Sequence, residues 1–361
     1  MMKDLRFRDR AGALELARLI ERLAPPEPVK FVHVCGTHEV AITEFGLRSL
    51  LPPQVEILEG PGCPVCVTPV KHIDEAVALA QGGHIVATFG DMARVPGTRT
   101  SLEGARSAGA DVRVVYSVAD AVELARKVEE EVIFFAVGFE TTAPTVAAAV
   151  LDGLPENFSL LVSHKLIPPA MAALLQGEHD ISGFLAPGHV STIIGMEPYQ
   201  IFPERYGLPV VIAGFEPLDI LYSIALLLRQ LREREPQVEN AYTRAVKPEG
   251  NVKAQAILSE VFEVTDHYWR GMGVIPDSGL KLPAGLGEWD ARKRFALEVE
   301  SDESLHPGCR CAQVITAKAT PDHCPLFNKR ACTPRTPYGP CMVGEEGMCH
   351  IWHRYGGRPK L

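Results

Sequence analysis

The 361-residue sequence lacks the features that mark several common protein classes. Its formal net charge is −9, and without a basic surplus nucleic acid is not expected to be a main partner. The longest apolar run, residues 220–228, is far shorter than the roughly 20 residues of a membrane-spanning helix. The N-terminus is charged from Lys3 onward and has no secretory-signal pattern. We therefore expect a cytoplasmic protein with no membrane and no nucleic-acid partner.

Signatures of nucleotide binding and of zinc knuckles are also missing. There is no P-loop Lys-Ser/Thr and no complete dinucleotide-binding glycine fingerprint, so nucleotide binding is not supported. Only one CxxC is present, which excludes a four-cysteine zinc knuckle built from two such pairs. Hydrophobic residues make up 46% and charged residues 22% of the chain, which is a composition that builds real cores rather than a disordered chain.

Short β-rich runs alternate with helical patterns over most of the chain. Each run ends in a loop of Gly, Pro, Thr or Cys, as where VKFVHV leads into CGTHE and VEILEG leads into PGCPVCVTP. This alternation predicts parallel sheets with right-handed crossovers, whose carboxyl-end loops carry the binding chemistry. The segments VGFETT and AGFEPLD resemble each other, so two related α/β halves are expected.

After Pro236 the character changes, and six of the nine cysteines lie in a proline-rich tail. Four of these are separated by seven, eight and seven residues, namely Cys324, Cys332, Cys341 and Cys349. The tail has few apolar runs, so metal coordination would supply folding energy that a core does not. Zinc ribbons draw ligands from two close pairs, whereas evenly spread thiolates fit an iron–sulfur cluster. We predict that these four cysteines hold the cluster, with zinc as the alternative.

The other two tail cysteines, Cys309 and Cys311, form a CxC. Residues two positions apart share a face of a regular strand. For both thiols to bind one cluster, we expect that the chain must also turn locally, which Gly308 would allow. We expect both outside the ligand set, either as a second dithiol or as buried packing. Four histidines near the tail cysteines are expected to surround the site or lie on the surface, namely His306, His323, His350 and His353.

These patterns predict an α/β fold with two Rossmann-like parallel-sheet domains plus a small Cys-rich C-terminal iron–sulfur domain. We expect the N-terminal domain with the thiol site at residues 1–118 and the second α/β domain at residues 119–235. The helical and loop-rich C-terminal domain is expected at residues 236–361.

Cys35 follows a predicted strand and precedes a helix. A thiol near a helix N-terminus has its thiolate stabilised by unpaired N–H groups and the helix dipole. Thr37, His38 and Glu39 add a hydroxyl, an imidazole and a carboxylate, which we expect to tune the site rather than build it. The alternative is a buried cysteine with Thr37 as the helix cap.

Cys63 and Cys66 form the CxxC in GPGCPVC, again between a strand and a helix. This placement fits a dithiol/disulfide pair with a depressed pKa, or two ligands of one metal. A pair of structural thiols is the alternative.

Four further loops place polar groups at strand ends, namely GDMARVPG, GFETTAP, the SHK of residues 163–165 and the PGHVS of residues 187–191. Any one of them alone is ordinary turn chemistry, but several converging on one sheet edge would indicate a site.

The motifs together point to a family. CGTHE, GPGCPVCVTP, FGDMARVPG, GFETTAPT, PGHVSTIIG, AGFEPLDIL and PCMVGEEGMC occur in this order over nearly the whole chain, which resembles the hydrogenase-maturation family HypD. The resemblance implies two α/β domains and a C-terminal domain with a [4Fe-4S] cluster. It makes Cys35 the iron-site cysteine, Cys63 and Cys66 the redox-active pair, and the tail cysteines the cluster region.

The resemblance also implies partners and a task. Members of this family act with the small protein HypC and hold the iron on which the Fe(CN)2CO group of [NiFe]-hydrogenase is assembled. Cyanide comes from a thiocyanate on HypE, which is the carrier of the HypE–HypF product, and the finished group passes to the hydrogenase large-subunit precursor. The CxxC is hypothesised to relay electrons toward Cys35. The alternatives are an iron–sulfur-dependent thiol–disulfide oxidoreductase and a zinc-stabilised binding protein.

Overall fold

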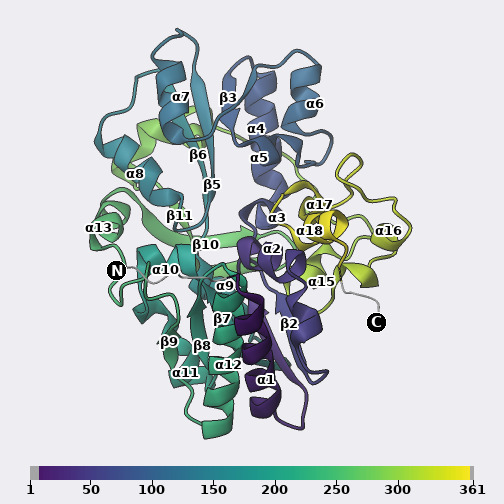
Figure 1. The fold of residues 1–361 in the computed structure, drawn as a ribbon. Coiled ribbons are helices and arrows are strands. Elements are labelled where there is room, and N and C mark those ends of the chain that lie inside the picture. Colours follow the sequence, from purple (N-terminus) through teal and green to yellow (C-terminus); the bar gives the residue numbers. More distant parts are fainter. Residues whose placement is uncertain (1–7, 358–361) are drawn as a thin grey trace.

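The structure is a computed structural model that describes residues 8–357, and it contains two parallel β-sheets (Figure 1). The first sheet has the order β2-β1-β7-β8-β9, with all neighbours parallel. Its strands are β1 (Val29–His33), β2 (Val55–Glu59), β7 (Ile181–Pro187), β8 (Val210–Ala213) and β9 (Val238–Asn240). The second sheet has the order β4-β3-β5-β6 and is also parallel. Its strands are β3 (Ile85–Thr88), β4 (Val112–Val114), β5 (Val132–Gly138) and β6 (Phe158–His164).

The α/β class with two Rossmann-like sheets is therefore confirmed, but the strands do not divide at residue 118. β1 and β2 belong to the sheet that also holds β7, β8 and β9, whereas β3 and β4 pair with β5 and β6. Strands from residues 1–118 thus contribute to both sheets. The alternation of strands and helices is the same in both sheets, so the sequence pattern contains no signal for the points where the chain leaves the first sheet and returns to it.

Helices cover both faces of each sheet, which explains why the central strands are apolar throughout. In β5 all seven residues are buried, and neighbouring side chains alternate between two cores. Phe134 packs with the helices α7 (Val118–Ala125) and α8 (Ala143–Leu151). Ile133 and Phe135 pack with α4 (Val70–Gln81), α5 (Gly90–Arg94) and α6 (Leu102–Ser107).

The first sheet is covered in the same way. On one face lie α1 (Arg10–Leu23) and α12 (Pro217–Glu233), which share a core with Phe31 and Leu185. Helix α1 begins where the Asp9 side chain accepts the N–H of Gly12 at 2.7 Å. The other face carries three shorter helices, α9 (Ile167–Ala173), α10 (Gly188–Ile194) and α11 (Ile201–Tyr206).

A two-stranded antiparallel ribbon crosses between the two sheets (Figure 1). Its strands are β10 (Glu263–Trp269) and β11 (Gly273–Lys281), which follow α13 (Val252–Val261). The remaining short elements before the tail are α2 (Gly36–Glu44), η1 (Leu47–Leu50), α3 (Pro64–Val67), η2 (Glu197–Tyr199), η3 (Ala284–Trp289) and α14 (Ala291–Arg294). Within residues 8–357 no helix is both long enough and apolar enough to cross a membrane.

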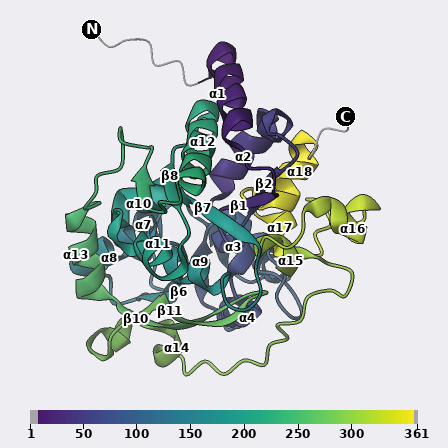
Figure 2. The same ribbon diagram turned by 90° about the horizontal axis from the view of Figure 1, so that it is seen from below.

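The cysteine-rich tail forms a small irregular unit of short helices. These are α15 (Cys311–Ile315), η4 (Pro321–His323), α16 (Pro325–Asn328), α17 (Pro340–Val343) and α18 (Met348–Tyr355). Both views place α18 beside α2 (Figures 1 and 2), and α17 packs on α3. The tail therefore covers the two segments that carry the CGTHE and CxxC motifs.

Candidate functional site

Both sheets have a topological switch point, where strand order reverses and parallel sheets usually bind ligands. In the first sheet the chain passes from β1 outward to β2, and from β7 outward to β8 on the other side. The crevice beyond β1 and β7 is therefore its switch point, and Cys35 lies two residues after the end of β1. In the second sheet the switch point lies between β3 and β5.

Cys35 is the extended N-cap residue of α2 and only 9% exposed. Burial raises the pKa of its thiol to about 12, and the Glu346 carboxylate adds to this shift. The N–H groups of Thr37 and His38 at the helix start do favour the thiolate, as expected, but burial outweighs them. A cation such as iron would have to displace the thiol proton to bind here.

The Cys35 loop and the CxxC loop touch through a glycine. A Cβ atom at Gly62 would lie 2.2 Å from the backbone nitrogen of Cys35, so only glycine allows this approach. On its other side the Cys35 loop meets the tail, where a Cβ atom at Gly36 would lie 2.4 Å from the Cβ atom of Glu346. Glycine is therefore required at these positions of CGTHE and GPGCPVC. A side chain at Gly62 would push the CxxC loop away from the Cys35 loop, and one at Gly36 would push the tail away from it.

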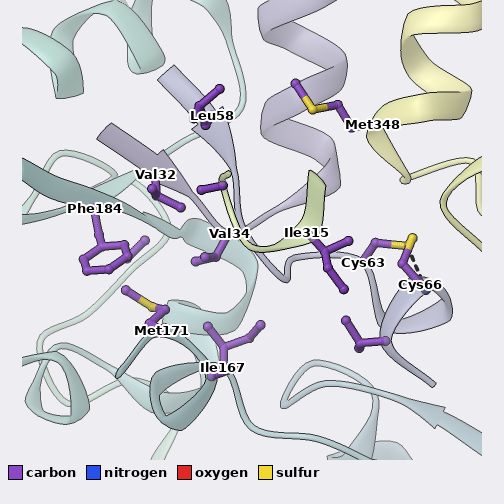
Figure 3. Close-up of a cluster of buried hydrophobic side chains, with 14 of the residues drawn as sticks. Val32, Val34, Leu58, Cys63, Cys66, Ile167, Met171, Phe184, Ile315 and Met348 are labelled. Carbon is purple, nitrogen blue, oxygen red and sulfur yellow. Dashed lines mark hydrogen bonds between the residues drawn. A yellow bond between two sulfur atoms is a disulfide. The ribbon is translucent and has the colours of Figure 1, made fainter. Parts of the chain in front are cut away.

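Cys63 and Cys66 form a disulfide with a Cα–Cα distance of 5.3 Å at the start of α3. The two residues are 2% and 1% exposed, and they belong to a buried cluster that also contains Val34 (Figure 3). The tail closes over this disulfide, since a Cβ atom at Gly344 would lie 3.3 Å from the Cys63 sulfur. The CxxC is therefore in reach of both the Cys35 loop and the tail, and its reversible reduction stays a prediction.

Glu39 joins α2 to the tail. Its carboxylate accepts hydrogen bonds from His33 Nε2 (2.9 Å), Thr43 (2.6 Å), Trp352 Nε1 (2.8 Å) and both terminal nitrogens of Arg48 (2.8 and 2.6 Å). Burial alone would raise the pKa of Glu39, but Arg48 and His33 hold it well below its usual value. An ionised carboxylate with this many donors is an anchor for α2 and α18.

His38 and Thr37 lie nearer to the thiol. His38 Nε2 donates to the carbonyl of Ala213 on β8 at 3.3 Å, and its Nδ1 is buried without a partner among the described residues. Burial lowers the pKa of His38 to about 3, so the imidazole is neutral. Thr37 donates to Glu346 Oε1 at 3.4 Å. Both side chains thus flank Cys35 without adding charge beside it.

The six tail cysteines gather in one place, and Cys309 and Cys311 are among them. A Cβ atom at Gly339 would lie 2.7 Å from the Cys309 sulfur and 3.8 Å from the Cys311 sulfur. The reason is a turn at Arg310, whose φ of −109° and ψ of 19° are not those of an extended strand. Contact with Cys311, together with burial, raises the pKa of the Cys309 thiol well above its usual value.

Comparison with known proteins identifies the family. The family model HypD, described as "Hydrogenase formation hypA family", matches residues 12–356. The chain belongs to the HypD family. It is 45% identical to the hydrogenase maturation factor HypD2 of Bradyrhizobium diazoefficiens, over 97% of this chain and 96% of that protein. It is 43% identical to a putative hydrogenase expression/formation protein of Methanocaldococcus jannaschii, over 97% and 99% of the two chains.

In this member of the HypD family the donor chemistry of the tail thiols can be compared with that of an iron–sulfur cluster. No three Cys, His, Asp or Glu side chains among residues 8–357 are arranged to hold one metal ion. A [4Fe-4S] cube separates its four thiolates more widely than one ion does, and a set of buried soft thiols is its usual donor set. The donor chemistry of the tail therefore fits an iron–sulfur cluster.

The neighbours of the thiols suggest which four belong together. Burial raises the pKa of Cys332, and Cys309 and Cys324 add to the shift. Cys349 contacts Cys341, and Cys311 and the same two thiols lie within its electrostatic reach. Cys341 instead contacts Cys311 and Cys349.

Two carboxyl groups at this HypD-family site, one buried and one exposed, were not found from the sequence. Glu59, the last residue of β2, is 2% exposed and accepts the N–H of Met348 at 3.0 Å through Oε2, and its Oε1 has no partner among the described residues. Burial and the nearby Glu39 raise the pKa of Glu59 well above its usual value. Glu346 is an exposed residue of the tail, and partial desolvation raises its pKa. Only their position beside the motifs could have pointed to them, because their surroundings arise from tail packing.

Proposed function

We propose that this chain is the scaffold on which, together with HypC, the Fe(CN)2CO group of [NiFe]-hydrogenase is assembled. The iron is cargo, with Cys35 as its protein ligand. A soft thiolate suits a low-valent iron that carries cyanide and CO. Membership of a hydrogenase-maturation family supports the task, and the position of Cys35 at the switch point of the first sheet supports the residue.

Cyanide delivery needs electrons close to this iron. Cleaving the S–C bond of a thiocyanate carried by HypE consumes two electrons and one proton, and it gives a free thiol and cyanide. Oxidation of the Cys63–Cys66 dithiol to the disulfide supplies two electrons. A [4Fe-4S] cluster in the tail would supply the single electrons that restore the dithiol. The hydrogenase large-subunit precursor would then accept the finished group.

The proposed ligands of that cluster need one change from the set expected from spacing. Cys324, Cys332 and Cys349 are retained. The neighbourhoods of the thiols favour Cys309 in place of Cys341, since Cys309 lies near Cys332 and Cys349. Cys341 then pairs with Cys311 outside the ligand set.

One observation carries the proposal, namely the direct contact of three segments that are far apart in the sequence. Gly62 brings the disulfide loop against Cys35, and the tail lies against both loops. The Cys35 loop, the CxxC disulfide and the cysteine-rich tail therefore meet in one place, which supports a joint role for them. A binding protein with no redox task has no need of this arrangement.

The proposal is tested by iron analysis of protein purified anaerobically with HypC. Wild type should contain one iron more than the cluster accounts for, and Cys35→Ser should lose that iron while keeping its visible absorption. Ser223→Ala is the control, because Ser223 is buried on α12, where its hydroxyl donates to the carbonyl of Asp219. Full iron in Cys35→Ser would refute the assignment.

A thiol–disulfide oxidoreductase that acts on an outside protein remains the second candidate, because a disulfide is present. The burial of both sulfurs under the tail disfavours it, since an outside thiolate must reach a disulfide sulfur to exchange with it. Reduction of an added protein disulfide by the wild type, with no extra iron bound, would favour this candidate.

A further inference from the structure

The second sheet presents a buried acid at its own switch point. Glu140 lies two residues beyond Gly138, the last residue of β5, and β5 borders the crevice between β3 and β5. The residue belongs to the loop GFETTAP, which contains one of the polar groups at strand ends noted in the sequence. Nothing in the proposed assembly of the iron group has used this carboxyl group so far.

Glu140 is 2% exposed and has one satisfied and one unsatisfied oxygen. Oε1 accepts the N–H of Ile167 at 2.8 Å, and Oε2 has no partner among residues 8–357. No cation pairs with it in the described part of the chain, and burial raises its pKa to about 7. The carboxyl group therefore gains and loses a proton near neutral pH.

The surroundings of Glu140 link it to the thiol site. Its neighbour Phe139 and its partner Ile167 belong to the hydrophobic cluster that contains Cys63 and Cys66. Figure 3 shows Ile167 and the disulfide within this cluster. Helix α3, which carries Cys66, packs on β5. Glu140 thus follows the strand on which the CxxC helix packs, and it binds a residue of the cluster that encloses the disulfide.

The titratable groups around Glu140 include one from the first-sheet half. The phenol of Tyr199 on η2 is fully buried, and its pKa is raised by burial and further by Glu140 and Cys35. Tyr199 also contacts Ser191 on α10, with 3.2 Å between the two oxygens. Glu140 and Cys35 are therefore both within electrostatic reach of one phenol, and Glu140 is the group of these whose pKa lies near neutral pH.

The chemistry of the proposed function leaves one proton to be placed. When a dithiol reduces a thiocyanate, its two S–H bonds release two protons and two electrons and one S–S bond forms. One proton goes to the thiol that leaves the cyanide. Cyanide binds iron as an anion, so the second proton has no acceptor in the reaction. Restoring the dithiol takes up two protons with two electrons.

We propose that Glu140 is the carboxyl group that accepts this proton when Cys63 and Cys66 form the disulfide, and that returns it when the disulfide is reduced. This inference rests on the proposed redox function of the CxxC. It gives the carboxylate form of Glu140 the role of a base for the thiols. A base of this kind makes dithiol oxidation depend on the protonation of Glu140 rather than of a cysteine.

The test is the pH dependence of dithiol oxidation in the full-length, anaerobically purified protein. A small neutral diazenedicarboxamide accepts two electrons and two protons, and the remaining thiols are alkylated and counted by mass spectrometry. In wild type the rate should rise with pH through an inflection near 7. Glu140→Gln keeps an acceptor for Ile167, and it should be slower by about 100-fold at pH 7, with its inflection moved to the ordinary thiol range of about 8.5.

Ser223→Ala is the control, because Ser223 is buried on α12 away from the thiol site, and it should keep the inflection near 7. The inference is overturned if wild type lacks an inflection near 7 or if Glu140→Gln retains it. The wild-type profile decides the matter even if the variant does not fold. Failure of Cys63 and Cys66 to interconvert at all would instead overturn the proposed redox function.

Discussion

The substitution Gly62→Ala tests the contact that brings Cys35 and the disulfide loop together. An ordinary contact needs at least 3.4 Å, whereas a Cβ atom at Gly62 has 2.2 Å to the Cys35 nitrogen. Both groups are backbone and cannot turn away as a side chain can. One loop must therefore retreat by roughly 1 Å, and a misplacement of this size at a reacting group costs about 100-fold in rate.

Two assays follow from this magnitude. We expect Gly62→Ala to lower the free energy of unfolding by about 1–3 kcal/mol, as overpacking does, measured by urea titration. We also expect the dithiol oxidation rate to fall by about 100-fold because the site is displaced. Gly285→Ala is the control, because its Cβ atom would meet nothing within 4 Å. Wild-type stability together with a wild-type rate in Gly62→Ala would refute the close contact.

Three further predictions concern the tail and its anchor. Trp352→Phe removes one hydrogen bond to the ionised Glu39 and should cost roughly 1.5–3 kcal/mol in urea unfolding, and no loss would mean that this bond does not hold the tail. Because its partners hold the pKa of Glu39 below the ordinary 4.5, its stabilising effect should be present at neutral pH and lost as the pH falls below 4.5. Glu39→Gln should flatten this part of the stability profile, and an unchanged profile would contradict the assignment. Cys309→Ser should bleach the visible absorption of the cluster whereas Cys341→Ser keeps it, and the reverse result would restore the ligand set expected from spacing.

Local sequence patterns predicted the strands and helices better than they predicted which strands pair with each other. The run VIFFAVG is apolar at every position and becomes the fully buried β5, as expected for a parallel strand. Which sheet each strand joins was not predicted, because β1 pairs with β7 across a long separation in sequence. Such pairings depend on the whole fold rather than on any local window of residues.

At the site, too, features set by neighbouring residues were predicted, whereas features set by tertiary packing were not. The positions of Cys35 and Cys63 at strand-to-helix turns were predicted, since turn chemistry is local. The protonated state of Cys35 was not, because the tail that buries it lies more than 300 residues away, at Glu346. The turn at Arg310, which brings Cys309 toward Cys311, also has no marker in the sequence.

Infrared spectroscopy of the protein purified anaerobically with HypC tests the central claim most directly. Cyanide and CO bound to iron absorb in a region where protein groups do not. Wild type should show bands of both ligands, and Cys35→Ser should lose all of them while its visible absorption and its fold are unchanged. Cyanide and CO bands of full intensity in Cys35→Ser would contradict the account, because the iron would then be held elsewhere.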